Sequence, residues 1–203
     1  MIGVLDIGLG NIASVIRMIE KVGGTAVRIS EPQKIFEVKK LILPGVGNFE
    51  RGMLNISSRN FLTALRERIV DDGIPVLGIC LGMQLLCVRS EESTLPGLGF
   101  VNADVIKFRT IPAQVLKVPH MGWNTIDVTR ENSLIKRSIE EQRFYFVHSY
   151  YVLPRMPDIL IGMTSHGVNF CAAFQVGNIY GVQFHPEKSH RFGMSLMRQF
   201  VEL

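Results

Sequence analysis

A cysteine flanked by two glycines lies where a strand pattern gives way to a helix pattern. Residues 74–79 form an apolar run that is typical of a buried strand, and residues 83–86 are good helix formers. Gly78 and Gly82, each two positions from Cys80, permit a sharply bent backbone between these elements. The junction therefore predicts a strand, a tight turn that carries one thiol, and a helix that begins directly after it.

Strand and helix patterns alternate along the first half of the chain. The strand-like segments are 1–8, 25–30 and 39–45, and the helix-like segments are 11–24, 31–38 and 60–73. Such alternation indicates a parallel sheet covered by helices on both faces. We therefore expect an α/β, flavodoxin-like doubly wound sheet that is mostly parallel.

The second half of the chain is richer in strands. Strand patterns occupy 103–108, 113–118, 123–128, 143–153 and 158–165, a hairpin is expected over 169–186 with its turn at 177–178, and a helix over 189–203. These segments predict an added antiparallel part in the C-terminal half. Because no linker-like composition separates the halves, we expect residues 1–203 to form a single domain.

Composition narrows the classes of function. The net charge is +4 with acids and bases interspersed, so we expect no nucleic-acid partner. No apolar run is long enough to span a bilayer, and the N-terminus does not read as a signal peptide, so we expect no membrane partner. The three cysteines, Cys80, Cys87 and Cys171, lack metal-ligand spacing. We expect a cytoplasmic protein with no metal and no cofactor.

The position of Cys80 suits a nucleophile. A helix N-terminus carries unsatisfied N–H groups and a partial positive charge, which stabilise the reactive thiolate. The alternative is a small buried hydrophobic residue, the usual role of a free cysteine. The flanking glycines favour the nucleophile, because a packing cysteine does not require them.

Two further segments supply the remaining groups of a nucleophilic site. In “FHPEKS”, His185 and Glu187 are two positions apart in a segment expected to be extended, so both side chains would face the same side, as a base and the acid that orients it. In “LPGVGNF”, Gly45 and Gly47 would let backbone N–H groups, with that of Leu81, form an oxyanion hole. The alternatives are a surface His–Glu pair and an ordinary loop.

Taken together, the motifs resemble a known family. “PGVGNF”, “GICLGMQLL” and “HPEKS”, in this order, resemble the triad-type, or class I, glutamine amidotransferases. “DIGLGN”, “PHMGWN” and “FYFVHSYY” narrow the resemblance to the glutaminase subunits of imidazole glycerol phosphate synthases, over the full length of the chain. Members of that family split glutamine into glutamate and ammonia through a cysteine thioester.

The resemblance implies a role for each matching residue. Cys80 would be the nucleophile, His185 the general base and acid, and Glu187 the residue that orients His185. Backbone N–H groups at Val46, Gly47 and Leu81 would face the oxyanion. Glutamine would be held by Gln84, Glu92, His148, Ser149 and Tyr150. A buried Gln84 could instead satisfy a backbone group.

The resemblance also implies a partner, a (β/α)8-barrel cyclase subunit that forms a heterodimer with this chain and receives ammonia through a channel. Asn11, Trp123, Tyr145 and Lys188 match positions near that interface. Trp and Tyr are enriched at binding surfaces, although Trp123 could equally be a core anchor.

A second pathway stays open at the level of sequence. Ile7 stands where the family usually has an aromatic residue, and His190 where members of the histidine pathway more often have glutamine. “RFYFVHSYYVLP” and “HPEKSHRFGM” also resemble paralogous subunits that supply ammonia for the amination or amidination of surface-polysaccharide sugars. The glutaminase chemistry would be the same in both pathways, and we expect histidine synthesis.

Overall fold

Five parallel strands form the first part of the central sheet. The computed structural model describes residues 1–109, 116–137 and 140–203. Its parallel strands run in the order β2-β1-β3-β4-β12. Their bounds are β1 (Ile2–Leu5), β2 (Ala26–Ile29), β3 (Lys40–Gly45), β4 (Val76–Cys80) and β12 (Ile179–Val182). This is the flavodoxin-like order, with β12 as its fifth strand, so the predicted fold class is confirmed.

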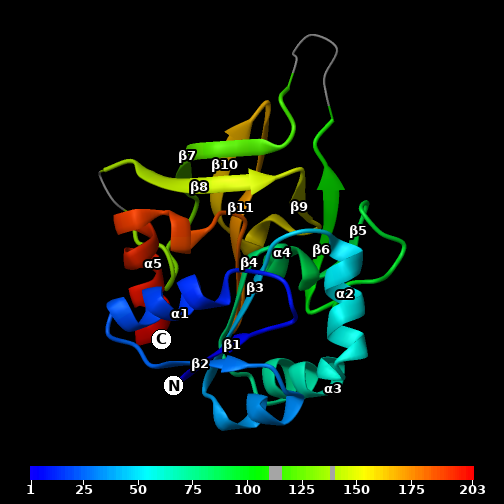
Figure 1. Ribbon diagram of the computed structural model, residues 1–203. Helices are drawn as coiled ribbons and strands as arrows, with labels where there is room; N and C mark the ends of the chain where they lie inside the picture. Colours follow the sequence, from blue (N-terminus) through cyan, green and yellow to red (C-terminus); the bar gives the residue numbers. More distant parts are fainter. Residues whose placement is uncertain (110–115, 138–139) are drawn as a thin grey trace.

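Antiparallel strands continue the sheet beyond β12. The hairpin partner β11 (Val168–Val176) is followed by β10 (Leu160–His166), β7 (His120–Val128) and β8 (Gln142–His148). A branch is formed by β9 (Tyr150–Pro154), which pairs antiparallel with β11 and with β6 (Val101–Lys107), and by β5 (Cys87–Ser90), which pairs in parallel with β6. In Figure 1, β7, β8 and β10 lie beyond the carboxyl ends of the parallel strands.

Helices cover both faces of the parallel strands (Figure 1). On one face lie α1 (Ile12–Lys21) and α5 (His190–Glu202), and on the other lie α2 (Phe49–Ser58) and α3 (Phe61–Arg66). The short helix α4 (Leu81–Leu85) follows β4 directly. Short 3₁₀ helices occur at η1 (Pro32–Glu37), η3 (Pro157–Ile159) and η4 (Pro186–Lys188), and a short π-helix, η2 (Glu67–Asp71), follows α3.

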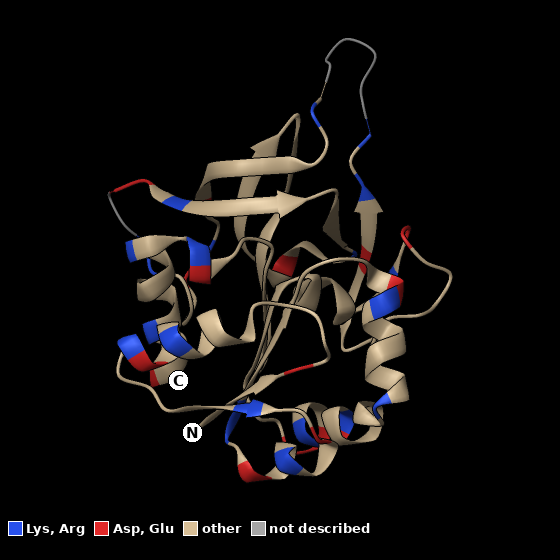
Figure 2. Cartoon of the chain, in the orientation of Figure 1, with Lys and Arg blue, Asp and Glu red and all other residues tan. Residues whose placement is uncertain are grey.

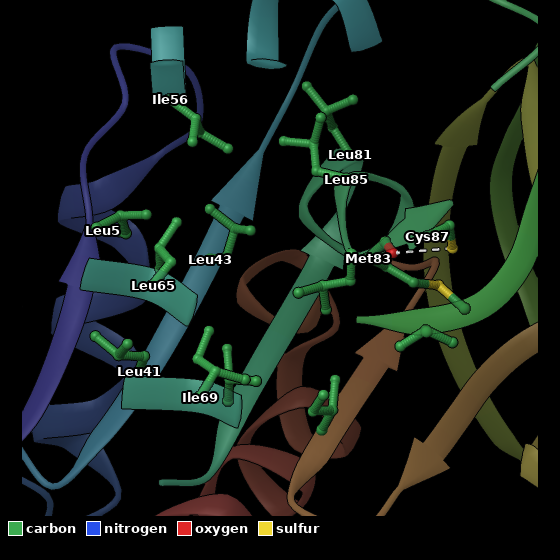
Figure 3. Close-up of a cluster of buried hydrophobic side chains, with 14 of the residues drawn as sticks. Leu5, Leu41, Leu43, Ile56, Leu65, Ile69, Leu81, Met83, Leu85 and Cys87 are labelled. Carbon is green, nitrogen blue, oxygen red and sulfur yellow. Dashed lines mark hydrogen bonds between the residues drawn. The ribbon is translucent and has the colours of Figure 1, made fainter. Parts of the chain in front are cut away.

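Alternation along the strands builds two apolar clusters, one on each face of the sheet. Leu41 and Leu43 of β3 join the cluster under α2 and α3, where Figure 3 shows them beside Leu65 and Ile69. Ile42, between them in sequence, belongs instead to the cluster under α1 and α5. Successive strand residues face opposite sides, so β3 is buried on both faces, as expected of a parallel strand between two helical layers.

Several predicted elements are wrong in detail. Residues 143–153 were expected as one strand, but β8 ends at His148 and β9 begins at Tyr150, because β8 pairs with β7 whereas β9 pairs with β6 and β11. The sequence reading also misses α2 and β5. Of the strand expected over 113–118, residues 113–115 lie outside the described part, and 116–118 form no strand.

Charged residues of both signs are intermixed along the described chain, without a stripe of one sign (Figure 2). Within the same residues, no helix is both long enough and apolar enough to cross a membrane.

The turn from β4 into α4 brings two backbones unusually close together. A Cβ atom at Gly82 would fall well inside van der Waals contact with the carbonyl oxygen of Leu43 on β3. A Cβ atom at Gly78 would lie 2.7 Å from the Cα of Met83. Because these neighbours are backbone atoms, they cannot move aside as a flexible side chain would. The two glycines of the motif are therefore required by close packing.

We predict that Gly82→Ala destabilises the fold by about 3 kcal/mol or more, because overpacking here pushes α4 away from β3. The control is Gly73→Ala, where φ is +68° but no atom lies within 4 Å of an added Cβ. This control should cost only about 1 kcal/mol through its backbone conformation. Urea denaturation measures both free energies of unfolding, and equal losses would contradict the packing argument.

Candidate active site

Cys80 adopts a backbone conformation that few residues other than glycine tolerate. At the end of β4 its φ is 54° and its ψ is −107°. Such a conformation costs about 1–3 kcal/mol and persists only where the surroundings impose it. Here β4 before the residue and the close contact of Gly82 with β3 after it impose that bend. The bend places the thiol beyond the carboxyl end of the sheet, at the start of α4.

His185 reaches the same place from the neighbouring strand. β12 lies beside β4 with Val182 opposite Ile79, and the chain continues past the end of β12 to His185. The backbone N–H of His185 donates to the carbonyl of Tyr145 (2.9 Å), and the hydroxyl of Ser189 donates to the carbonyl of His185 (2.6 Å). These bonds hold the backbone of His185 in place, and its imidazole interacts with Cys80.

The His185–Glu187 pair is almost completely buried. His185 Nδ1 lies 2.7 Å from Glu187 Oε1, and the two side chains are 1% and 3% exposed, so the surface-pair alternative is wrong. Burial lowers the pKa of His185, whereas Cys80 and Glu187 raise it, and the net result is a pKa of about 10. Its Nε2 has no hydrogen-bond partner within the described residues. The pair therefore leaves one basic nitrogen available to the thiol.

The local conformation behind this contact differs from the prediction. Residues 185–187 were expected to be extended, with both side chains on one face. Instead Pro186–Lys188 forms the single turn η4, and this turn brings Glu187 back towards His185. The proline fixes φ for the first position of such a turn, which the extended interpretation overlooked.

A cavity of about 290 Å³ opens beside Cys80. It brings together the residues predicted for the oxyanion hole and for substrate binding, which come from the loop after β3, from α4, from the turn after β5, and from the β8–β9 junction. Its lining consists of Val46, Gly47, Cys80, Leu81, Gln84, Glu92, Pro119, Val147, His148, Ser149 and Tyr150. The structure thus places these predicted residues around one site.

Two polar side chains in the cavity are held by the fold. Gln84 Nε2 donates to the carbonyl of Tyr150 and to Gln183 Oε1, both at 3.0 Å, which leaves its own Oε1 as an acceptor. Glu92 Oε2 accepts from the backbone N–H of Phe49 (2.8 Å), at the N-terminus of α2, where a carboxylate is stabilised. Both groups are therefore pre-positioned in the cavity wall.

Gln183 is a site residue that the sequence analysis missed. It is fully buried, and its Nε2 lies 3.7 Å from Cys80 Sγ while its Oε1 accepts from Gln84. The signal that could have revealed it is its position: Gln183 is a polar residue within an apolar run, two positions before His185. On an extended strand such residues share a face.

Three of the four predicted interface residues form a group next to η4. Trp123 is 48% exposed, so it is not a core anchor. Its ring is stacked on His190 and lies edge-on to Tyr145, and Lys188 Nζ is 5.6 Å from the centre of the Tyr145 ring. Asn11 is exposed and caps α1 by accepting from the backbone N–H of Ser14.

Among residues 1–109, 116–137 and 140–203, no group of three or more His, Cys, Asp or Glu side chains could hold a metal ion. The three cysteines are free and buried.

Comparison with known proteins gives the same family. The family model described as “Glutamine amidotransferase class-I” matches residues 3–203. The chain is 46% identical over 202 residues to “Imidazole glycerol phosphate synthase subunit HisH 2” of Methanococcus maripaludis, covering 100% of this chain and 99% of that protein. It is 45% identical to the protein of the same description from Pseudomonas aeruginosa, covering all of both chains.

Solved structures show the same fold at lower identity. A crystal structure of a glutamine amidotransferase superposes with a TM-score of 0.71 at 17% identity, covering 97% of this chain and 98% of that one. The structure of PurLQS from Thermotoga maritima superposes with a TM-score of 0.68 at 17% identity, covering 98% and 94%. The chain therefore belongs to the class I glutamine amidotransferase family and, within it, to the HisH subunits of imidazole glycerol phosphate synthase.

Proposed function

We propose that this chain hydrolyses glutamine to glutamate and ammonia with Cys80, His185 and Glu187, and delivers the ammonia to a cyclase subunit in histidine biosynthesis. The observation that carries the proposal is the buried His185, whose Nδ1 is bound to Glu187 and whose Nε2 is unpaired beside Cys80. A base held in this way by an acid is the arrangement that activates a cysteine nucleophile.

The first half of the reaction forms a thioester. His185 takes the thiol proton on Nε2, and Cys80 Sγ attacks the side-chain amide carbon of glutamine. The raised pKa of His185 lets the imidazole hold this proton at neutral pH. Backbone N–H groups at Leu81 and at Val46 or Gly47 stabilise the oxyanion. His185 then donates the proton to the leaving nitrogen, the C–N bond breaks, and ammonia departs.

The second half releases glutamate. Water takes the place of ammonia, gives a proton to His185 Nε2, and forms a bond to the thioester carbon. The C–S bond breaks and the proton returns to Cys80 Sγ, so the enzyme is regenerated. Because the same imidazole acts as base and acid in both halves, its orientation by Glu187 matters throughout the cycle.

The cavity suits glutamine as the substrate. The Glu92 carboxylate offers an acceptor for an α-ammonium group, and the Gln84 Oε1 atom offers a second acceptor. The segment from His148 to Tyr150 supplies the opposite wall. These groups surround Cys80 from α4, the turn after β5 and the β8–β9 junction, which would hold the substrate amide at the thiol.

The partner in this proposal is a cyclase subunit with a (β/α)8 barrel, bound over Trp123, Tyr145, Lys188 and Asn11. The relatives are named as subunits of imidazole glycerol phosphate synthase, which supports an assembly of more than one subunit. We propose that residues 1–203 act as one domain and work in the cytoplasm, where free cysteines stay reduced.

The relatives bear on the choice between pathways. The proteins from M. maripaludis, P. aeruginosa and Moorella thermoacetica carry imidazole glycerol phosphate synthase in their names. These matches, at 40–46% identity, support histidine biosynthesis and give no support to the surface-polysaccharide alternative.

We predict that Cys80→Ser lowers the rate of glutamate release by about 10³-fold or more, because a serine hydroxyl is a far weaker nucleophile than a cysteine thiolate at neutral pH. The control is Cys171→Ala, which removes a buried thiol that does not line the cavity. Glutamate formation in the presence of the cyclase is the assay, and binding to the cyclase should persist in both variants. Ammonia release by Cys80→Ser at the wild-type rate would reject the nucleophile.

We also predict how His185 couples to stability. Its folded-state pKa of about 10 lies above the ordinary value of 6.5, so protonation stabilises the fold fully below pH 6.5. This contribution is lost as the pH rises towards 10. The free energy of unfolding of wild type minus that of His185→Asn, from urea denaturation, should therefore shrink from pH 6 to pH 10. A difference that grows with pH would contradict the assignment.

The proposed interface with the cyclase is tested by substituting Trp123. Trp123→Ala should weaken binding to the cyclase about tenfold or more, because exposed aromatic residues dominate interface energies. The control Phe36→Ala removes another exposed aromatic ring, on η1, and should leave the affinity unchanged. Isothermal titration calorimetry measures both dissociation constants, and equal effects would place the interface elsewhere.

A further inference from the structure

Three histidines outside the triad gather behind the cavity wall. His120 begins β7, His148 ends β8 and His166 ends β10. The rings of His120 and His166 are stacked with centres 4.3 Å apart, and Phe108 and Phe170 pack against His120 and His148. His120 and His148 are both buried, and only His148 lines the cavity.

The outer end of this cluster fixes the proton on His120. Asn124 Nδ2 donates to the carbonyl of Ser165 (2.9 Å), and its Oδ1 accepts from the backbone N–H of Thr125 (2.9 Å), so the orientation of the amide is determined. The same Nδ2 lies 3.2 Å from His120 Nε2, which must therefore accept. In a neutral imidazole one nitrogen accepts and the other carries hydrogen, so the proton of His120 is on Nδ1.

The inner end fixes the proton on His148 independently. His148 Nδ1 lies 2.7 Å from the carbonyl of Tyr150, which can only accept, so this nitrogen carries hydrogen. His148 Nε2 is then an acceptor, and it lies 3.0 Å from His120 Nδ1. The contacts of Asn124 at one end of this hydrogen-bonded series and of Tyr150 at the other therefore require the same pattern, with hydrogen on Nδ1 of both His120 and His148. Burial lowers the pKa of His120 to about 4 and that of His148 to about 3, so both rings are neutral at physiological pH.

This series of hydrogen bonds ends at the Tyr150 carbonyl and Gln84, which line the cavity. The Tyr150 carbonyl that accepts from His148 also accepts from Gln84 Nε2, and Gln84 in turn binds Gln183, the neighbour of Cys80. The bond from Gln84 to the Tyr150 carbonyl therefore ties the wall formed by the β8–β9 junction to the floor formed by α4, and His148 holds the same carbonyl from within the wall. A rotated or differently protonated His148 would lose its own bond to that carbonyl.

We propose that His120 is a positioning residue for glutamine binding: its Nδ1–H fixes the orientation and tautomer of His148, which holds the Tyr150 carbonyl and the cavity wall in place. This inference rests on the proposed glutaminase function for its kinetic consequence. The predicted tautomers of His120 and His148 do not depend on that function and can be measured without an activity assay.

Nitrogen-15 NMR of the histidine side chains tests the proton pattern in the wild-type chain at pH 7. We expect His120 and His148 to carry hydrogen on Nδ1. His166 should carry it on Nε2, which lies 2.8 Å from the carbonyl of Lys117 and serves as an internal contrast. Hydrogen on Nε2 of His120 or His148 would overturn the proposal.

Kinetics in the complex with the cyclase test the consequence. His120→Phe keeps a ring but cannot donate, and should raise the KM for glutamine about three- to tenfold, with kcat changed by less than about twofold. His120→Asn can donate from a position close to Nδ1 and should restore KM to within about twofold of wild type. The control Phe108→Leu removes ring packing from the same cluster without removing a hydrogen bond, and should leave KM unchanged.

The outcomes are distinguishable. An unchanged KM in His120→Phe, or an equal rise in Phe108→Leu, would overturn the positioning role while leaving the glutaminase intact. Absence of glutamine hydrolysis by the wild-type complex would instead reject the proposed function. If His120→Phe does not fold, the NMR pattern and the KM of His120→Asn decide the question.

Discussion

The bent backbone at Cys80 is the constraint on which the rest of the site depends. A positive φ at a residue with a side chain is unfavourable, and this protein maintains it by packing the first turn of α4 against the backbone of β3 at Gly82. The bend takes the thiol out of the sheet at its carboxyl edge. Only there can a residue that follows the adjacent parallel strand, His185, lie beside it.

The two parts of the sheet contribute different components. The parallel part supplies Cys80, the proposed nucleophile, at the end of β4 and the glycine loop after β3, and its last strand, β12, leads to His185, the proposed base. The antiparallel part supplies the wall of the cavity and the backbone partner of the base, since His185 N–H donates to Tyr145 on β8. The candidate site thus depends on both parts of the sheet, and the hairpin of β11 and β12 joins them.

The sequence predicts what is local and misses what depends on pairing partners. The strand, turn and helix around Cys80 follow from two glycines and the change of periodicity, and this element is confirmed. The break at Ser149 could not be predicted from the continuous strand pattern of residues 143–153, because the break arises from the pairing of β8 and β9 with different strands. Gln183 and His120 were overlooked for the same reason, because the hydrogen bond that places each of them at the site is made with a residue distant in the sequence, Cys80 and His148 respectively.

The central claim, that His185 activates Cys80, is tested most directly by the rate at which iodoacetamide modifies Cys80, measured from pH 6 to pH 10 in wild type and in His185→Asn. Because only a thiolate reacts, the account predicts that wild type is modified much faster than the variant at pH 7 and that the two rates converge at high pH. Site-specific mass spectrometry separates Cys80 from the buried Cys87 and Cys171. Superimposable profiles would contradict the account.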